Sequence, residues 1–263
     1  MSESQISQRL EWALEASQRA AEFIMPYFQS ADLTIENKAD SSPVTLADKG
    51  AEQLLRAEIE KYFPGDGILG EEFGQIAGSN GFQWIIDPID GTKSFVHGTP
   101  LFGTLVGLVH DGQTVAGVCR FPALNEVVYA QNGGGAFWQK ADGSTVRAAV
   151  STVNELSQSL FCYTSVGGWI TVDGLDKFEN LCRTTRIARG WGDCYGHMLV
   201  ATGRAEVMID PLLNPWDAAA LVPIVTEAGG VFVDWKGEVT IEGGNGISTA
   251  PQLRDIVLAA VQD

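Results

Sequence analysis

The chain has 263 residues, and its composition of 45% hydrophobic and 19% charged residues is typical of an ordered globular protein with a sizeable core. A formal net charge of -16, with no dense stripe of Lys and Arg, argues against binding to nucleic acid or to an anionic membrane. Because no apolar run approaches the roughly 20 residues that span a bilayer, and the first residues do not resemble a secretory signal, we expect a cytoplasmic protein.

Two helices separated by a polar loop are expected at the start of the chain. Apolar residues at helical spacing predict a helix over residues 6–28 that stops at or just beyond Pro26. Thr45 can cap a second helix over residues 45–63, which a Pro-Gly pair would end. The polar residues 35–43 between them are expected to form a mobile loop.

Short strands dominate the next part of the chain. Turn signals at Asp111-Gly112 and Gly133-Gly134-Gly135 separate them, so the pattern predicts an antiparallel meander. The expected strands cover residues 68–71, 82–87, 104–110, 114–121, 126–130 and 136–139.

The second half alternates strands and helices. Residues 143–155 mark a seam, so we expect one half over 1–148 with the metal-binding motifs and another over 149–263 with the specificity segment and a Trp-Asp motif. Helices layered on sheets in this order predict an α+β fold. The expected strands cover residues 160–163, 185–188, 205–209 and 231–235, and the expected helices cover 173–182, 193–202, 216–228 and 252–261.

Neither zinc nor covalent chemistry is expected. Cys119, Cys162, Cys182 and Cys194 are scattered without a Cys-x-x-Cys spacing, so we expect buried reduced thiols rather than a zinc site or a disulfide framework. The histidines lie too far apart in the sequence for a zinc cluster, and no Ser or Cys has a recognisable nucleophile context.

Three acidic residues are the strongest functional signal. Asp87 and Asp90 flank Pro88 at the end of an apolar strand, and Asp217 follows a Trp far along the chain. Ionised carboxylates at a strand end repel each other unless a cation lies between them. Because Pro88 cannot donate a ladder hydrogen bond, the strand should end there and leave the acids and the Ile89 carbonyl facing a cleft. Such hard oxygen ligands are those that Mg²⁺ requires.

Local sequence leaves a second interpretation open for two of the acids. Asp217 is also placed to cap a helix that starts at Asn214, and Asp48 completes a Thr-x-x-acid capping box with Thr45. For Asp48 the capping role is the stronger interpretation of the local pattern. Glu71, with Asp217, could complete two adjoining metal sites.

Three segments, in this order and spacing, resemble the signature blocks of a known family: Gly70-Glu71-Glu72, Asp87-Pro88-Ile89-Asp90-Gly91-Thr92 and Trp216-Asp217-Ala218-Ala219. The family is the inositol monophosphatase-like superfamily of Mg²⁺-dependent, lithium-sensitive phosphatases, and the resemblance covers nearly the whole chain. It implies a layered α/β/α/β/α sandwich, usually a homodimer, that hydrolyses small phosphate monoesters.

The resemblance also implies which residues bind the metal ions. Glu71, Asp87 and the Ile89 carbonyl would hold one Mg²⁺, while Asp87, Asp90 and Asp217 would hold the second. Two cations about 3.5 to 4 Å apart polarise a phosphoryl group and lower the pKa of a bound water. No protein nucleophile is then needed.

Further roles follow from the same resemblance. Asp48 and Thr92 would orient and deprotonate the attacking water, and Glu71 would contribute to catalysis beside them. The amides of Gly91 and Thr92 would hold phosphate oxygens. Lys38 would lie on a loop that closes over a third, weaker metal.

The segment Arg189-Gly190-Trp191-Gly192-Asp193 resembles the histidinol-phosphatase branch of the superfamily, where it borders the substrate pocket. Arg189, Trp191 and Asp193 are therefore expected to contact substrate, although the local pattern equally allows Asp193 as a helix N-cap and Trp191 as a core residue. Asp210 takes the place where inositol phosphatases use Glu to grip a ring hydroxyl. Two acids suit the ammonium and imidazole of L-histidinol phosphate, and Trp191 would pack on its ring.

The sequence therefore predicts hydrolysis of L-histidinol phosphate in histidine biosynthesis. Within the superfamily the alternative is an inositol monophosphatase or a broad-specificity sugar or nucleotide phosphatase, with a 3'-phosphoadenosine phosphatase less favoured. A different class of function is a scaffold that binds phosphate or metal without catalysis. The presence of every acid and of the Thr that the chemistry requires favours an enzyme.

Overall fold

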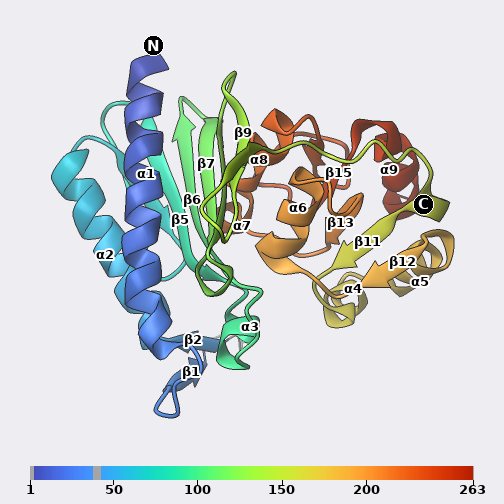
Figure 1. Cartoon of the computed structure of the whole chain (residues 1–263), viewed down its shortest axis with the longest axis horizontal. Helices are drawn as coiled ribbons and strands as arrows, with labels where there is room; N and C mark the ends of the chain where they lie inside the picture. Colours follow the sequence, from blue (N-terminus) through green and yellow to red (C-terminus); the bar gives the residue numbers. More distant parts are fainter. Residues whose placement is uncertain (1–2, 38–42, 263) are drawn as a thin grey trace.

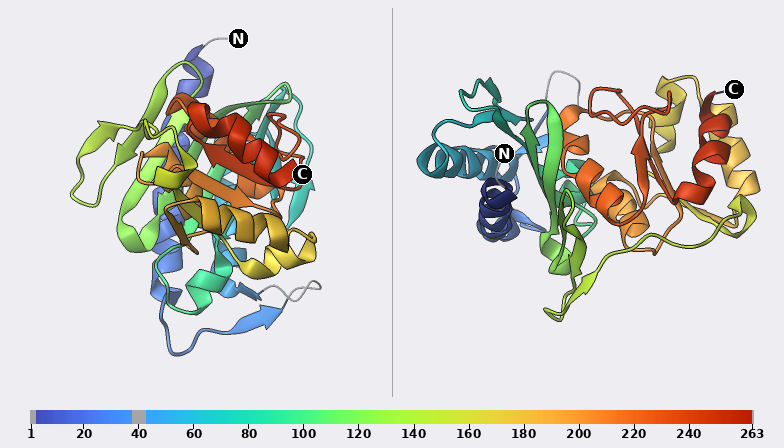
Figure 2. Two further views of the ribbon diagram at one scale, coloured as in Figure 1. Left: turned by 90° about the vertical axis from the view of Figure 1, so that its right-hand side faces the viewer. Right: turned by 90° about the horizontal axis from the view of Figure 1, so that it is seen from above.

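The computed structural model describes residues 3–37 and 43–262 of the chain. Within these ranges the strands form an eight-stranded sheet, a five-stranded sheet and a two-stranded hairpin. Figure 1 shows helices outside the larger sheet, further helices between the two sheets and a last group beyond the smaller sheet, and Figure 2 shows the same layers from above. This is the predicted α/β/α/β/α sandwich.

The outer layer on the larger sheet consists of α1 (Glu3–Ile24) and α2 (Leu46–Tyr62). Helix α1 buries one stripe of apolar and small side chains against the sheet, and a 3-10 turn over Met25–Tyr27 ends it near the predicted position. Helix α2 begins with a capping box in which Thr45 N donates to Asp48 Oδ2 at 2.8 Å and Thr45 Oγ1 accepts from Ala47 N at 3.1 Å. Both predicted helices are confirmed.

The larger sheet has the strand order β10-β9-β8-β7-β6-β5-β3-β4. From β5 to β10 each strand pairs antiparallel with the next along the chain, which confirms the predicted meander, while β3 is parallel to β5. The short edge strands β4 and β10 were not predicted. The strands are β3 (Gly67–Gly70), β4 (Gly74–Ile76), β5 (Phe82–Asp90), β6 (Gly103–His110), β7 (Gln113–Phe121), β8 (Glu126–Gln131), β9 (Gly135–Gln139) and β10 (Thr145–Arg147).

The prediction that strand pairing ends at Pro88 is wrong. Strand β5 continues to Asp90, and the register moves from Asp87 opposite Leu105 to Asp90 opposite Gly103. The chain therefore advances three residues along β5 for two along β6. This one extra residue is what defines a β-bulge. The Pro88 carbonyl accepts from Thr104 Oγ1 at 2.8 Å, so a side chain takes the place of a ladder hydrogen bond.

The predicted loop over residues 35–43 is also partly wrong. Strand β1 (Ile35–Asn37) pairs antiparallel with β2 (Pro43–Thr45). These strands are only three residues long and Ile35 is 49% exposed, so no apolar alternation marks them in the sequence. Lys38 lies outside the described residues.

The smaller sheet has the strand order β12-β11-β13-β15-β14, with β11 parallel to β12 and β13. Strand β15 was not predicted, because glycines dominate the residues that lead into it. The outer face of the smaller sheet is covered by α4, α5 and α9 (Figure 1). Helix α4 was not predicted. These elements are β11 (Leu160–Tyr163), β12 (Ile187–Arg189), β13 (Val207–Asp210), β14 (Val231–Val233), β15 (Gly246–Thr249), α4 (Val166–Thr171), α5 (Leu175–Thr184) and α9 (Arg254–Gln262).

The middle layer consists of α6 (Asp193–Ala201), α7 (Pro215–Ala218) and α8 (Leu221–Glu227). The single helix predicted over residues 216–228 is interrupted, because Pro223 has no N–H to donate to the carbonyl one turn earlier. The junction of α7 and α8 lies directly on the larger sheet. A Cβ added at Gly107 would come within 2.7 Å of Ala219 Cβ, and one at Gly117 would overlap the backbone of Ala220.

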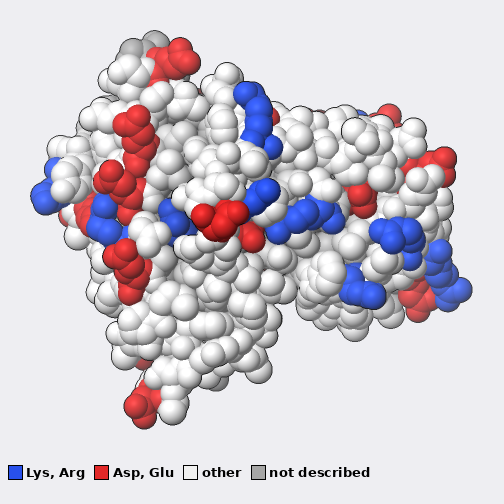
Figure 3. All heavy atoms as spheres, viewed as in Figure 1, with Lys and Arg blue, Asp and Glu red and all other residues white. Residues whose placement is uncertain are grey.

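The four cysteines are free, as predicted, although Cys182 is partly exposed rather than buried. Among the described residues, no helix combines the length and the apolar character that crossing a bilayer requires. On the face drawn in Figure 3, basic and acidic side chains are interspersed rather than segregated. The proposed division at residue 148 stays a prediction.

Candidate metal centre and active site

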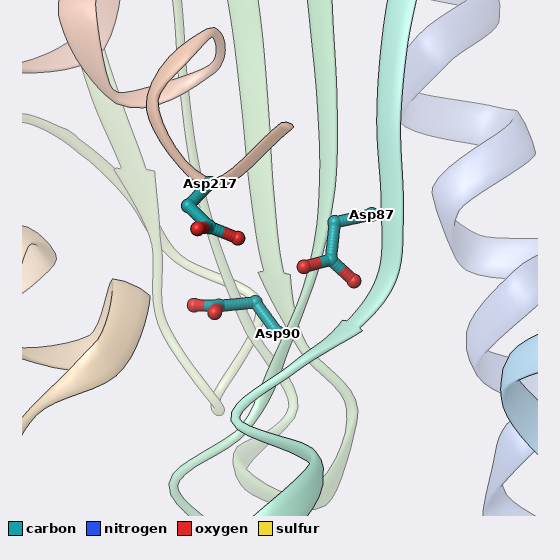
Figure 4. Close-up of side chains that lie close together, drawn as sticks. All are labelled: Asp87, Asp90 and Asp217. Atoms are coloured by element: carbon teal, nitrogen blue, oxygen red, sulfur yellow. The ribbon is translucent and has the colours of Figure 1, made fainter. Parts of the chain in front are cut away.

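Asp87, Asp90 and Asp217 come together at one end of the larger sheet (Figure 4), and one carboxylate oxygen from each lies within 4.8 Å of the others. The bulge in β5 presents the first two acids, and α7 supplies the third. The close contact of α7–α8 with β6 and β7 fixes this approach. The structure thus brings together the three acids that the sequence singles out.

A backbone amide orients each of these carboxylates. Ile89 N donates to Asp87 Oδ1 at 3.0 Å, and Cys194 N donates to Asp90 Oδ2 at 2.6 Å. Asn214 N donates to Asp217 Oδ2 at 2.7 Å, so the capping role of Asp217 is confirmed and coexists with its place in the cluster. Each acid thus has one oxygen oriented by a backbone amide.

The cluster stores electrostatic repulsion. Burial, together with the charges of Glu71, Asp90 and Asp217, raises the pKa of Asp87 well above its usual range. Burial also raises the pKa of Asp90, with Asp193 and Asp217 as further causes, and raises the pKa of Asp217 to about 7. Buried acids that repel one another are costly unless protons or cations neutralise them. The donor set fits a hard divalent cation.

Glu71 lies beside this cluster, at the end of β3. Its backbone N donates to Ile86 O at 3.3 Å, which extends the pairing of β3 with β5. Its charge is a principal cause, after burial, of the raised pKa of Asp87. The Ile89 carbonyl accepts from Thr92 Oγ1 at 3.0 Å and retains a second lone pair.

Asp48 and Thr92 also meet. The Asp48 Oδ2 atom serves the capping box, while Oδ1 lies 3.4 Å from Thr92 Oγ1, so the two interpretations of Asp48 are compatible. Burial raises the pKa of Asp48. Gly91, with φ of 84°, precedes the short helix α3 (Thr92–Val96).

Two adjoining cavities lie beside the cluster. They share the side chains of Lys93, Thr164, Ser165 and Asp193. The first, of about 180 Å³, extends from Asp90 and Asp217 to Asp210, and its other lining residues are Gly168, Cys194, His197, Pro211, Leu212, Leu213 and Leu221. The second, of about 240 Å³, is further lined by Pro43, Glu71, Gly91, Thr92 and Ser94.

A chain of hydrogen bonds that the sequence did not reveal orients Asp210. Its Oδ1 accepts from Thr164 Oγ1, and its Oδ2 lies 3.2 Å from His197 Nε2. His197 is fully buried, and its Nδ1 lies 2.7 Å from Ser248 Oγ. Thr164 Oγ1 in turn accepts from Asp193 N at 2.8 Å, which joins both expected substrate acids in one network.

Asp193 adopts a left-handed backbone conformation, with φ of 51°. It is the first residue of α6 and Gly192 is the N-cap, so the interpretation of Asp193 as an N-cap is wrong. A Cβ added at Gly91 would lie 3.2 Å from Asp193 Oδ2, which places this carboxylate against the Gly-Thr turn. Burial and the charges of Asp210 and Asp217 raise the pKa of Asp193 to about 7, although Lys93 opposes the shift.

The other expected substrate residues lie farther out. Trp191 is 40% exposed, so its interpretation as a core residue is wrong, and Arg189 is exposed with Nη1 donating to Ala188 O at 2.8 Å. Neither side chain lines the two cavities described above, and their contacts with substrate stay predictions. Lys93 was missed as a site residue, and its place after the Gly-Thr turn was the one available signal.

Comparison with known proteins gives a consistent result. Residues 5–263 match the model of the inositol monophosphatase family. The chain is 44% identical to the histidinol-phosphatase of Chlorobaculum parvum, over 92% of this chain and 91% of that protein, and 39% identical to that of Mycobacterium tuberculosis, over 94% and 95%. It superposes on an IMPase from Thermotoga maritima with a TM-score of 0.86 and 31% identity, over 97% of this chain and 96% of the other.

Proposed function

Because the chain belongs to the inositol monophosphatase family and is a phosphoric monoester hydrolase, we propose that it converts L-histidinol phosphate and water into L-histidinol and phosphate. The observation that carries this choice is the cavity that leads from the carboxylate cluster to Asp193 and Asp210. A wall with two acids suits a cationic leaving group. The similarity to two histidinol-phosphatases supports the same substrate and a place in histidine biosynthesis.

We propose that the metal is Mg²⁺, with Glu71, Asp87 and the Ile89 carbonyl holding one ion and Asp87, Asp90 and Asp217 holding another. Bound there, the ions would polarise the phosphoryl group, lower the pKa of water and neutralise the leaving alkoxide. The buried, mutually repelling carboxylates support this assignment. A third and weaker ion near Lys38 falls outside the described residues.

The chain's own residues would then position the reactants. Thr92 would hold the attacking water and pass its proton toward Asp48, whose Oδ1 lies 3.4 Å from the Thr92 hydroxyl. The amides of Gly91 and Thr92 would hold phosphate oxygens, and Lys93, which lines both cavities, would add a positive charge beside them. As the water oxygen bonds to phosphorus, the bond between phosphorus and the ester oxygen would break. The leaving alkoxide would take up a proton from solvent water, which balances the proton passed to Asp48.

Asp193 and Asp210 would bind the ammonium group of the alcohol. A carboxylate offers about four lone-pair sites, so Asp210 can accept from substrate while it contacts Thr164 and His197. The imidazole ring would contact the apolar wall of the cavity, with Trp191 at the rim. That wall is formed by Pro211, Leu212, Leu213 and Leu221.

Steady-state kinetics with purified protein and Mg²⁺ tests this proposal. We expect the highest kcat/KM for L-histidinol phosphate, a lower value for inositol 1-phosphate and the lowest for glycerol phosphate. A higher value for inositol 1-phosphate would instead establish the inositol monophosphatase alternative, which the likeness to the Thermotoga maritima structure favours. Phosphate release from none of these esters would favour a non-catalytic scaffold.

Three further proposals rest on the family resemblance. We propose that the protein is a homodimer, that millimolar lithium inhibits it and that it works in the cytoplasm. Sedimentation of the purified protein and a lithium titration of phosphate release test the first two.

A further inference from the structure

A buried carboxylate fastens the loop after β3 to helix α2. The side chain of Glu52, in the middle of α2, has no exposed surface. Its Oε2 accepts from Glu72 N at 2.7 Å, and its Oε1 accepts from Phe73 N at 3.1 Å. These two amides immediately follow Glu71, the proposed metal ligand.

Arg56 completes the attachment one turn later on the same helix. Its Nε donates to Glu52 Oε1 at 2.7 Å, and its Nη2 donates to the Gly74 carbonyl. Three consecutive residues, 72 and 73 of the loop and the first residue of β4, are therefore held by one side-chain pair on α2. Charge-assisted hydrogen bonds of this kind are among the strongest in proteins.

The sequence provides the space that this contact needs. A Cβ added at Gly70 would overlap the Glu52 carboxylate and lie 2.9 Å from Arg56 Nη2. The backbone conformation at position 70 does not require glycine, because its φ is not among the positive values. Its role is to admit Glu52.

Glu52 and Asp48 lie four residues apart, on the same face of α2. Asp48 reaches Thr92, and Glu52 reaches the loop that carries Glu71. Because Glu71 N also donates to Ile86 O, next to Asp87, the loop is held from both sides. We propose that Glu52 is a positioning residue that sets the Glu71 carboxylate in register with Asp87 for metal binding.

This inference rests on the proposed function, since that function makes Glu71 a ligand. Residues that orient metal ligands without touching the metal change its affinity by about 10- to 100-fold. Substitution of a residue that only stabilises the fold would lower the melting temperature and leave the metal affinity unchanged. The two roles are therefore separable.

Asp66 offers a matched control at the other end of β3. Its side chain is equally buried and accepts from Arg9 Nε at 2.8 Å, Asn80 Nδ2 at 2.8 Å and Trp84 Nε1 at 2.9 Å. Like Glu52, it accepts hydrogen bonds from several donors. Replacement by the neutral amide in either place sets an NH₂ group against donors and should destabilise the fold.

The experiment compares Glu52→Gln, Gly70→Ala and Asp66→Asn with the wild type. Mg²⁺ binding is measured by calorimetry, independently of turnover, and beside it the Mg²⁺ concentration for half-maximal phosphate release. We expect Glu52→Gln and Gly70→Ala to lower the Mg²⁺ affinity, and to raise the Mg²⁺ concentration for half-maximal phosphate release, by about 10- to 100-fold. The kcat should be largely restored at saturating Mg²⁺. Asp66→Asn should lower the melting temperature and leave Mg²⁺ binding unchanged.

Equal Mg²⁺ affinity in Glu52→Gln and in the wild type would overturn the inference. If the variants do not fold, hydrogen exchange of the wild type decides: the amides of Glu72 and Phe73 should be protected, and exchange at the rate of an open loop would reject the attachment. A wild type that binds Mg²⁺ but hydrolyses no monoester would contradict the proposed function alone.

Discussion

The two ends of the active-site cavity handle negative charge in opposite ways. At one end, Asp87, Asp90 and Asp217 crowd together, and a backbone amide orients each of them. At the other, Asp210 is held by Thr164 and His197 in a directed network. The first arrangement stores repulsion that a cation relieves, and the second fixes the direction in which an acid points. The proposed chemistry and the proposed substrate recognition therefore involve different parts of the site.

The largest expected effect is loss of the chemistry for every substrate. Asp90→Asn keeps an oxygen to accept from Cys194 N but removes a proposed metal ligand. Because metal ions contribute several kcal/mol to the transition state, kcat should fall by about 1,000-fold or more. Kinetics on both L-histidinol phosphate and glycerol phosphate should show the same loss. Near-normal turnover in this variant would show that catalysis does not require the Asp90 carboxylate, and would contradict the role proposed for this end of the cavity.

A more selective effect is expected at the other end. Asp193→Asn should lower kcat/KM for L-histidinol phosphate by about 10- to 100-fold, the value of a hydrogen bond to a charged group. The kcat/KM for glycerol phosphate, which has no ammonium, should change little. If both substrates lose equally, Asp193 serves the fold or the metal centre rather than recognition.

A smaller effect tests the network behind Asp210. His197→Gln should raise KM for L-histidinol phosphate by about fivefold, equivalent to one ordinary hydrogen bond, and leave kcat nearly unchanged. Ser248→Ala is the milder companion variant, because it removes only the bond to His197 Nδ1. A fall in kcat for glycerol phosphate in both variants would show that the network supports catalysis instead.

The last expected effect concerns stability rather than activity. Burial and neighbouring acids raise the pKa of Asp193 and Asp217 from 3.8 to about 7, so the folded state holds protons that the unfolded state releases. In EDTA, stability should therefore decrease as pH rises from about 4 to about 7. Thermal melts should show a larger stabilisation by Mg²⁺ at pH 8 than at pH 5, and a constant increment would contradict the expected repulsion.

The sequence predicted the end of the cavity with Asp87, Asp90 and Asp217 better than the end with Asp210, for a physical reason. Acids at the end of an apolar strand have no packing explanation, so Asp87 and Asp90 stand out locally. His197, Thr164 and Ser248 do not stand out, because each is an ordinary residue. Thr164 and His197 meet Asp210, and Ser248 meets His197, only after distant segments of the chain have assembled.

The fold shows the same limit. The capping box of Thr45 and Asp48 was evident because its partners are three residues apart. The bulge at Pro88 was missed, since the side chain that replaces its ladder bond, Thr104, comes from the neighbouring strand. Strand β15 was missed because its glycine-rich approach resembles a loop.

Gly107 and Gly117 have no reactive group, yet they govern how far apart the proposed ligands lie. Because the α7–α8 junction touches the bare strand surface at these two points, the gap between Asp217 and the bulge acids is set by main-chain contact rather than by adjustable side chains. A single methyl group at either position would push the α7–α8 junction away from the sheet and increase the distance between Asp217 and the two acids of the bulge. Engineers who seek a sturdier variant should therefore leave both positions untouched.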